Sequence, residues 1–110
     1  MNTEVLKFAE ACIFKGECER LGDSRKEKRE YRKIRSLYLF LKENQRLYEL
    51  IELLDHENPY VRLWAAAYTL QISPQKSEKV LEELIPLKGT LVGLSASITL
   101  KEWRKGNLNL

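Results

Sequence analysis

Few side chains in this sequence stand out by type and spacing as candidates for covalent or metal-assisted chemistry. The candidates are the single histidine, His56, and two cysteines, Cys12 and Cys18. A zinc site needs three or four protein ligands at suitable spacing, and no such set assembles around His56, although Asp55 and Glu57 flank it. A reactive thiol needs a nearby base or a positive environment, and no histidine lies near either cysteine. We therefore expect a non-enzyme with no metal and no cofactor.

The two cysteines are better explained as core residues. Both fall in a predicted helix over residues 3–21, six positions apart, which places them on different faces and makes a disulfide between them geometrically poor. Cys12 lies on the apolar stripe of that helix, and free cysteine is often buried. Reduced thiols and the absence of a signal-peptide pattern at the N-terminus predict a cytoplasmic protein.

The sequence feature with the most functional character is a basic stretch. Residues 24–35 contain seven basic and two acidic residues, a net charge of +5, whereas the whole chain carries +3. In a helix, five of these cations share the face opposite the apolar residues, and we call them the basic ridge: Arg25, Lys28, Arg29, Arg32 and Arg35.

The basic ridge has three interpretations. A solvated face would show the same pattern, and Glu27 and Glu30 dilute its charge. An acidic protein could bind the ridge by charge complementarity. Nucleic acid could also bind, because several Lys and Arg side chains hold phosphates at once.

A second candidate group lies at a predicted turn over residues 55–58. Asp55 and Arg62 are seven positions apart across this turn, and an Arg fork on a carboxylate would fix the angle between the flanking helices. We predict a structural pair, with ligand binding as the alternative because loops carry function. Trp64 and Trp103 are expected in the core, although solvent-facing aromatics could anchor a partner.

The elements that position these residues are predicted to be helices throughout. Apolar residues recur at helical spacing, and no segment shows convincing strand alternation. Gly22 and Gly106 are predicted helix stops, while Asn58 and Ser73 are predicted N-caps, each followed by a proline at the first helical position. These signals predict six helices, over residues 3–21, 24–43, 45–54, 59–71, 74–85 and 90–105.

Two of these helices have apolar residues that are predicted to face the core. The predicted core face of helix 24–43 consists of Tyr31, Ile34, Leu37, Tyr38 and Leu41. For helix 90–105 the expected apolar residues are Leu91, Leu94, Ile98 and either Leu100 or Trp103. The same helix carries a patch of small residues suited to close stacking, namely Gly93, Ala96 and Ser97.

The size and composition of the chain predict a single domain that spans residues 1–110. The chain has 110 residues, 44% of them hydrophobic, with only five glycines and three prolines. These values suit a single hydrophobic core rather than disorder or a turn-rich β fold. No run of eighteen apolar residues occurs, so we expect no membrane partner.

A weak internal repeat predicts how the helices stack. A shift of 30 positions aligns three pairs of identical residues: Leu54 with Leu84, Ala66 with Ala96, and Leu70 with Leu100. Repeated helical pairs leave an apolar face uncovered and stack on their neighbours. We predict an all-α fold in which about six helices form a short α-α superhelix, a HEAT- or armadillo-like stack of helical hairpins.

Several segments carry a resemblance to a known family. They are Leu54–Ala66, Val80–Leu84, Gly93–Gly106 and the N-terminal Phe8–Ala11 with Gly16-Glu17. Over nearly its whole length the chain resembles small bacterial HEAT-like repeat proteins of unknown function. The resemblance implies an all-helical bacterial cytoplasmic protein and brings no catalytic or ligand residues. Small proteins of this kind are sometimes encoded beside toxins as immunity partners.

The leading functional prediction is a non-catalytic module that binds another protein. Its motivation is the repeat-like pattern, because helical stacks bind partners on an extended surface. The alternatives are nucleic-acid binding through the basic helix 24–35 and a role as a toxin-immunity partner. The sequence assigns no oligomeric state.

Overall fold

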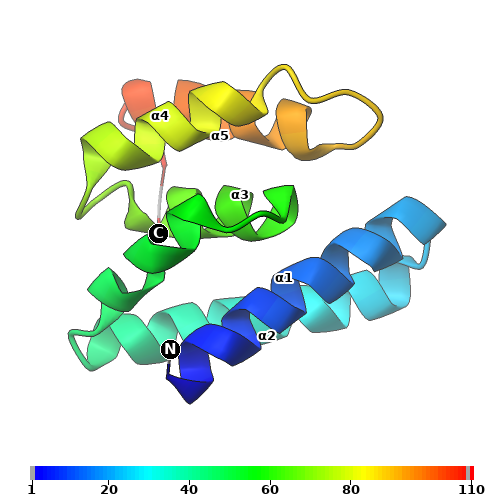
Figure 1. The fold of residues 1–110 in the computed structure, drawn as a ribbon, viewed down its shortest axis with the longest axis horizontal. Helices are drawn as coiled ribbons and strands as arrows, with labels where there is room; N and C mark the ends of the chain where they lie inside the picture. The colour runs from blue at the N-terminus through cyan, green and yellow to red at the C-terminus, as the bar shows by residue number, and fades with distance from the viewer. Residues whose placement is uncertain (1, 109) are drawn as a thin grey trace. The chain divides into compact units, whose positions relative to one another are not determined.

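The computed structural model describes residues 2–108 and 110, and over these residues the fold is all-α, as predicted, with no strand. Five α-helices and one 3-10 helix follow one another (Figure 1): α1 Thr3–Leu21, α2 Ser24–Glu43, η1 Leu47–Asp55, α3 Pro59–Thr69, α4 Pro74–Leu84 and α5 Val92–Arg104. The predicted helix ends agree with these bounds to within two residues. Among the described residues, no helix combines the length and the apolarity that a membrane span requires.

The main difference from prediction is the type of the third helix. η1 is a 3-10 helix of nine residues, which is long for this type. The buried residues Leu47, Leu50 and Leu53 are spaced by three, and this spacing aligns them on one side of a helix with three residues per turn. Burial of that row therefore favours the 3-10 form.

The chain divides into two compact units, Met1–Leu50 and Ile51–Leu110, with the division inside η1. The single helical-repeat domain over residues 1–110 and the superhelical stack stay predictions.

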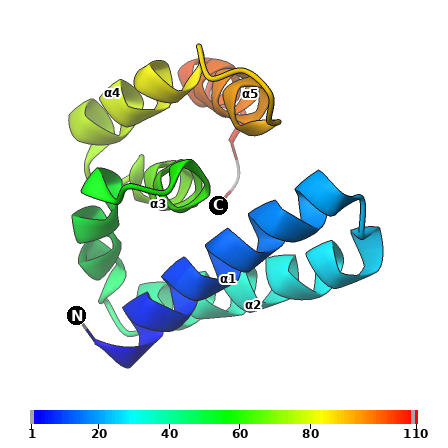
Figure 2. The ribbon, with the colours of Figure 1, turned by 45° about the vertical axis from the view of Figure 1, so that its right-hand side comes forward.

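The first unit is built on a helical hairpin. α1 and α2 lie side by side in both views of the ribbon (Figures 1 and 2). Gly22 joins them at φ +76°, where glycine carries no steric penalty. The Gly22 N–H donates to Glu19 O and the Asp23 N–H to Cys18 O, which is a Schellman motif. Asp23 then caps α2 by accepting from the Lys26 N–H at 3.1 Å.

The core of this hairpin sets the rotation of both helices. Val5, Phe8 and Cys12 of α1 are fully buried, as are three residues on the predicted apolar face of α2, namely Ile34, Tyr38 and Leu41. Burial of each large apolar side chain contributes about 1.5–3 kcal/mol. Leu37 is half-buried and Tyr31 exposed, so the buried face of α2 is narrower than predicted.

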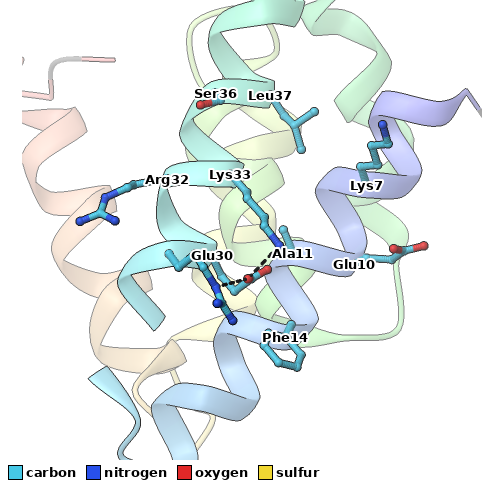
Figure 3. A pocket seen from close by; sticks show the side chains of 10 residues that line it. Lys7, Glu10, Ala11, Phe14, Glu30, Arg32, Lys33, Ser36 and Leu37 are labelled. Carbon is cyan, nitrogen blue, oxygen red and sulfur yellow. Dashed lines mark ion pairs between the residues drawn. The ribbon is translucent and has the colours of Figure 1, made fainter. Parts of the chain in front are cut away.

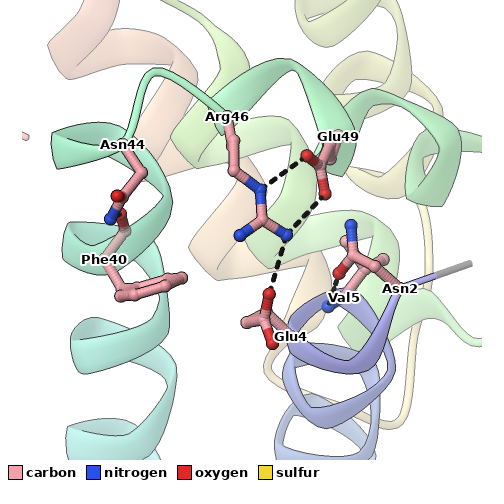
Figure 4. Close-up of polar contacts among 7 residues, drawn as sticks. All are labelled: Asn2, Glu4, Val5, Phe40, Asn44, Arg46 and Glu49. Carbon is pink, nitrogen blue, oxygen red and sulfur yellow. Dashed lines mark hydrogen bonds and ion pairs between the residues drawn. The ribbon is translucent and has the colours of Figure 1, made fainter.

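Arg46 ties the start of α1 to the start of η1 (Figure 4). Its Nε donates to Glu49 Oε2 at 2.8 Å, and its Nη2 donates to Glu4 Oε1 at 2.7 Å. The turn that brings Arg46 here includes Gln45 at φ +57°. The hydrogen bond from Arg46 lowers the pKa of the Glu49 carboxyl below its ordinary value. The two carboxylates, Glu49 foremost, raise the pKa of the guanidinium.

In the second unit, helix caps and a buried hydroxyl pair connect α3 and α4. Asn58 Oδ1 accepts from the N–H groups of Tyr60 and Val61, so the predicted cap is confirmed. Ser73 is the N-cap of α4, as predicted, with Pro74 after it, but among the described residues its side chain makes no capping hydrogen bond. One turn into α4, the buried Ser77 hydroxyl lies 2.8 Å from Thr69 Oγ1 of α3. A buried pair of this kind satisfies both polar groups.

α5 buries only part of the predicted residues: Leu100 and the small residues Gly93 and Ala96 are buried, whereas the other expected apolar residues are not. Leu91, Leu94 and Ile98 are exposed, Leu94 by 60%. The buried face contains Val92, Gly93, Ala96 and Leu100. Gly93 explains this orientation of the helix, because a Cβ there would lie 2.5 Å from Ile85 O and 2.7 Å from Leu87 O. Small residues admit this close backbone approach, and it outweighs burial of the larger leucines.

Substitution Gly93→Ala tests this contact. Helix propensity alone would favour alanine by about 1 kcal/mol, but overpacking costs about 1–3 kcal/mol. Since both obstructing atoms belong to the backbone, we expect a net loss of about 1–2 kcal/mol in the free energy of unfolding. Denaturant unfolding followed by circular dichroism measures it. Ser97→Ala in the same helix is the control, and a G93A variant as stable as this control would contradict the contact.

Substitution Glu49→Gln tests the Arg46 cluster. The pKa of Glu49 is lower in the folded protein than its ordinary value of about 4.3. The ionised carboxylate therefore stabilises the fold above that pH, and the stabilisation disappears as the pH falls through the folded pKa. We expect E49Q to lower the melting temperature at neutral pH and to flatten its decline between about pH 5 and pH 3. Glu52→Gln, at an exposed carboxylate, should leave the decline as steep as in the wild type.

Candidate interaction surface

The basic ridge lies along the outer face of α2. Arg25, Lys28, Arg29 and Arg32 are exposed and Arg35 is half-buried, on the side of the helix away from the buried residues. This placement agrees with the helical spacing. A binding role for the ridge stays a prediction.

Three of the five ridge cations have no ion pair within the described part of the chain: Arg25, Lys28 and Arg32. The other two are engaged. Arg29 Nε lies 3.7 Å from Glu30 Oε2, and the Arg35 guanidinium lies 5.4 Å from the centroid of the Tyr38 ring. Positive charge on this face is therefore available to a binding partner.

The two acidic residues of the stretch are engaged with neighbouring cations. Glu27 Oε1 lies 3.6 Å from Lys15 Nζ of α1. Glu30 is only 3% exposed and lies 3.1 Å from Lys33 Nζ. Glu30 therefore offsets part of the ridge charge through Arg29, whereas Glu27 pairs with a cation outside the ridge. Only the structure reveals the pair between Glu27 and Lys15, since Lys15 belongs to another helix.

A groove of about 860 Å³ lies beside the ridge, between α1 and α2. Its apolar part comes from Ala11 and Phe14 of α1 and Leu37 of α2, and Figure 3 shows Lys33 reaching toward the Glu30 carboxylate beside these side chains. The charged residues that line it are Lys7, Glu10, Arg29, Glu30, Arg32 and Lys33. Sequence reasoning missed this site, because Phe14 lies off the apolar stripe and no pattern relates it to α2.

The comparison with protein families covers nearly the whole chain. A family profile described as "Domain of unknown function (DUF2019)" matches residues 4–103. The chain belongs to this family. No curated protein and no solved structure matches the chain. The family assignment agrees with the resemblance to proteins of unknown function, whereas the HEAT-like character stays a prediction.

The histidine of this DUF2019 chain is part of a local turn. The Asn58 N–H donates to His56 Nδ1 at 3.0 Å, so one imidazole nitrogen stabilises the backbone ahead of α3. Within residues 2–108 and 110, no three His, Cys, Asp or Glu side chains are grouped to hold a metal ion.

Both cysteines of the DUF2019 chain are free and buried. Cys12 is fully buried, as predicted, and burial raises the pKa of its thiol well above the ordinary value, with the charge of Lys15 acting weakly in the opposite direction. A thiol in such an environment is a poor nucleophile, because the thiolate is the reactive form.

The predicted Asp55–Arg62 pair is not among the ion pairs of the described residues. Asp55 Oδ2 accepts instead from Lys76 Nζ at 3.3 Å. Arg62 is half-buried, and its buried Nε has no hydrogen-bond partner within the part of the chain that the structure describes. Asp55 and Arg62 do line one pocket of about 200 Å³, together with Glu83 of α4. Lys76 lies 21 positions beyond Asp55, which is why spacing across the turn could not identify it.

Trp64 and Trp103 are half-buried, so neither is fully in the core as expected. The Trp64 ring lies 5.9 Å from that of Tyr68. Trp103 Nε1 donates to Glu78 Oε2 at 3.4 Å, and Arg104 pairs with Glu78 at 3.2 Å. The second tryptophan thus belongs to a polar contact between α4 and α5.

The burial of the thiols predicts their reactivity. We expect the native protein to react negligibly with a thiol reagent such as Ellman's reagent at about pH 8, where an exposed thiol of pKa about 8.5 would be partly ionised. Denaturant should expose both thiols and release two equivalents of product. Rapid reaction of one thiol in the native protein, at unchanged helical content, would show that this cysteine is accessible.

Proposed function

We propose that this DUF2019 protein is a non-catalytic module that binds an acidic protein partner through the basic ridge. The observation that carries the proposal is the set of exposed cations Arg25, Lys28 and Arg32, which have no ion pair among the described residues. Of the acidic residues near them, Glu27 pairs with Lys15 of α1, and Glu30 pairs with Lys33 and Arg29. A surface of one sign steers an oppositely charged partner and sets its orientation.

The arrangement of charge favours this function over a merely solvated face. Solvated helix faces are commonly stabilised by pairs of opposite charge three or four positions apart. Among the described residues, Arg29 is the one ridge cation with an acidic partner, and that partner is the adjacent Glu30. Like charges close together on one helix are unfavourable, and a partner that neutralises them would relieve this repulsion.

The candidate chemical groups support a non-catalytic role. Burial disfavours the Cys12 thiolate, and His56 Nδ1 accepts a backbone hydrogen bond. A toxin-immunity role would be one case of the proposed protein binding.

The first test is affinity capture from a lysate of the native cells at about 0.15 M salt, where surface charges are only partly screened. The lysate is divided into arms with and without nuclease. We expect one protein in both arms. A partner that is lost on nuclease treatment would contradict the proposal and make nucleic acid the ligand.

Charge reversal of the ridge shows whether it carries the interaction. The variant Arg25→Glu/Lys28→Glu/Arg32→Glu should lose the captured protein. Its fold should tolerate the first changes, since acidic residues are favourable near a helix N-terminus. The matched control, Lys79→Glu/Lys88→Glu/Lys101→Glu, changes the net charge equally at exposed lysines of the second unit and should retain the partner. Equal retention by both variants would exclude the ridge.

A further inference from the structure

We propose that the groove between α1 and α2 holds the apolar side chains of an acidic, helical segment of the partner. The inference rests on the proposed function and extends it from a charged face to a defined binding site. The groove, rather than the ridge alone, would then decide which acidic proteins bind.

The size and lining of the groove suit side chains of a partner helix. Its volume of about 860 Å³ lies in the range of ligand pockets. Phe14 is 41% exposed although it is a large aromatic residue, and Ala11 and Leu37 extend the apolar part. An amphipathic helix places apolar residues at three- and four-residue spacing into such a groove.

The charge around the groove selects an acidic helix. Lys7, Arg29, Arg32 and Lys33 outnumber Glu10 and Glu30 by two charges. Arg29 and Lys33 pair with Glu30. Lys7 on α1 and Arg32 on α2 make no ion pair within the described part of the chain, so each helix of the groove carries a cation that acidic residues of the bound segment can meet. Figure 3 shows these two side chains on separate helices.

The carboxylates in the groove favour a peptide over nucleic acid. Glu10 is exposed, and the buried Glu30 lies beside the apolar part. A phosphate backbone carries charge at every step and would be repelled by the exposed Glu10, whereas the charge of Glu30 is neutralised by Arg29 and Lys33. A helix can instead place apolar side chains beside these carboxylates and its own acidic side chains near Lys7 and Arg32.

The direct test uses a defined probe. A synthetic amphipathic peptide of about 16 residues, made of Glu, Ala and Leu with leucines on one helical face, tests the predicted mode of binding. A second peptide replaces these leucines by Ser and keeps the charge. Fluorescence anisotropy with labelled peptide measures both dissociation constants, and we expect the leucine peptide to bind about tenfold more tightly, as for loss of a central anchor.

Substitution Phe14→Ala tests whether the peptide binds in the groove rather than on the apolar surface around it. We expect it to weaken binding of the leucine peptide by about tenfold. Leu39→Ala is the matched control, because Leu39 is 38% exposed on α2 but does not line the groove. This control should leave binding unchanged. Circular dichroism establishes that both variants keep their helices.

Substitution Lys7→Glu tests the charge of the groove independently of the ridge, because Lys7 lies on α1 and is not a ridge residue. We expect it to weaken peptide binding by about fivefold, as for a charge at an interface rim. Lys79→Glu makes the same change of net charge at an exposed position of α4 and should have no effect. This pair keeps the inference testable even if Phe14→Ala disturbs the hairpin.

Three results would overturn the inference: equal affinity for the two peptides, equal effects of Phe14→Ala and Leu39→Ala, or displacement of the peptide by a single-stranded oligonucleotide at lower concentration than by unlabelled peptide. None of them decides the proposed function. The proposed function is tested separately, by capture of a partner protein from the lysate and by loss of that protein in the charge-reversal variant of the ridge.

Discussion

The burial of one face of α2 against α1 is the constraint on which the functional surface depends. Ile34, Tyr38 and Leu41 are fully buried, and their contribution of several kcal/mol holds the helix in one rotation. With that face inward, the ridge must lie outward and Phe14 must lie beside the groove. The Schellman turn at Gly22 keeps the two helices paired. A rotation of α2 would expose the core and bury the cations, which is prohibitive without partners for them.

In the first unit, some charged side chains form ion pairs with one another, and others face solvent. Glu27, Glu30 and Glu49 each lie beside a cation within the unit, and Arg46 bridges two helices through Glu4 and Glu49. Exposed ion pairs contribute little stability, so their main consequence is the arrangement of charge. The carboxylates neutralise the cations beside them, and excess positive charge remains on the ridge.

The second unit follows a different principle, in which small residues decide the packing. Gly93 approaches the carbonyl groups of Ile85 and Leu87 so closely that no side chain fits. Ala65, Ala66 and Ala96 are fully buried and likewise allow close packing. Dense packing of this kind has little tolerance for added volume. As a consequence, Leu91, Leu94 and Ile98 remain on the surface, where hydrophobicity alone would not place them.

The sequence by itself determined the local features of this protein. Helical spacing and the signals at Gly22, Asn58 and Pro74 predict the helices to within two residues, because capping and periodicity depend on near neighbours. Helical spacing also predicts that the ridge lies on the exposed face of α2, for the same reason. Only the tertiary structure decided the contacts between distant residues: Lys76 rather than Arg62 at Asp55, Lys15 at Glu27, the Arg46 cluster, and the groove at Phe14. These depend on how helices pack, and packing brings together side chains whose spacing along the chain carries no periodic signal.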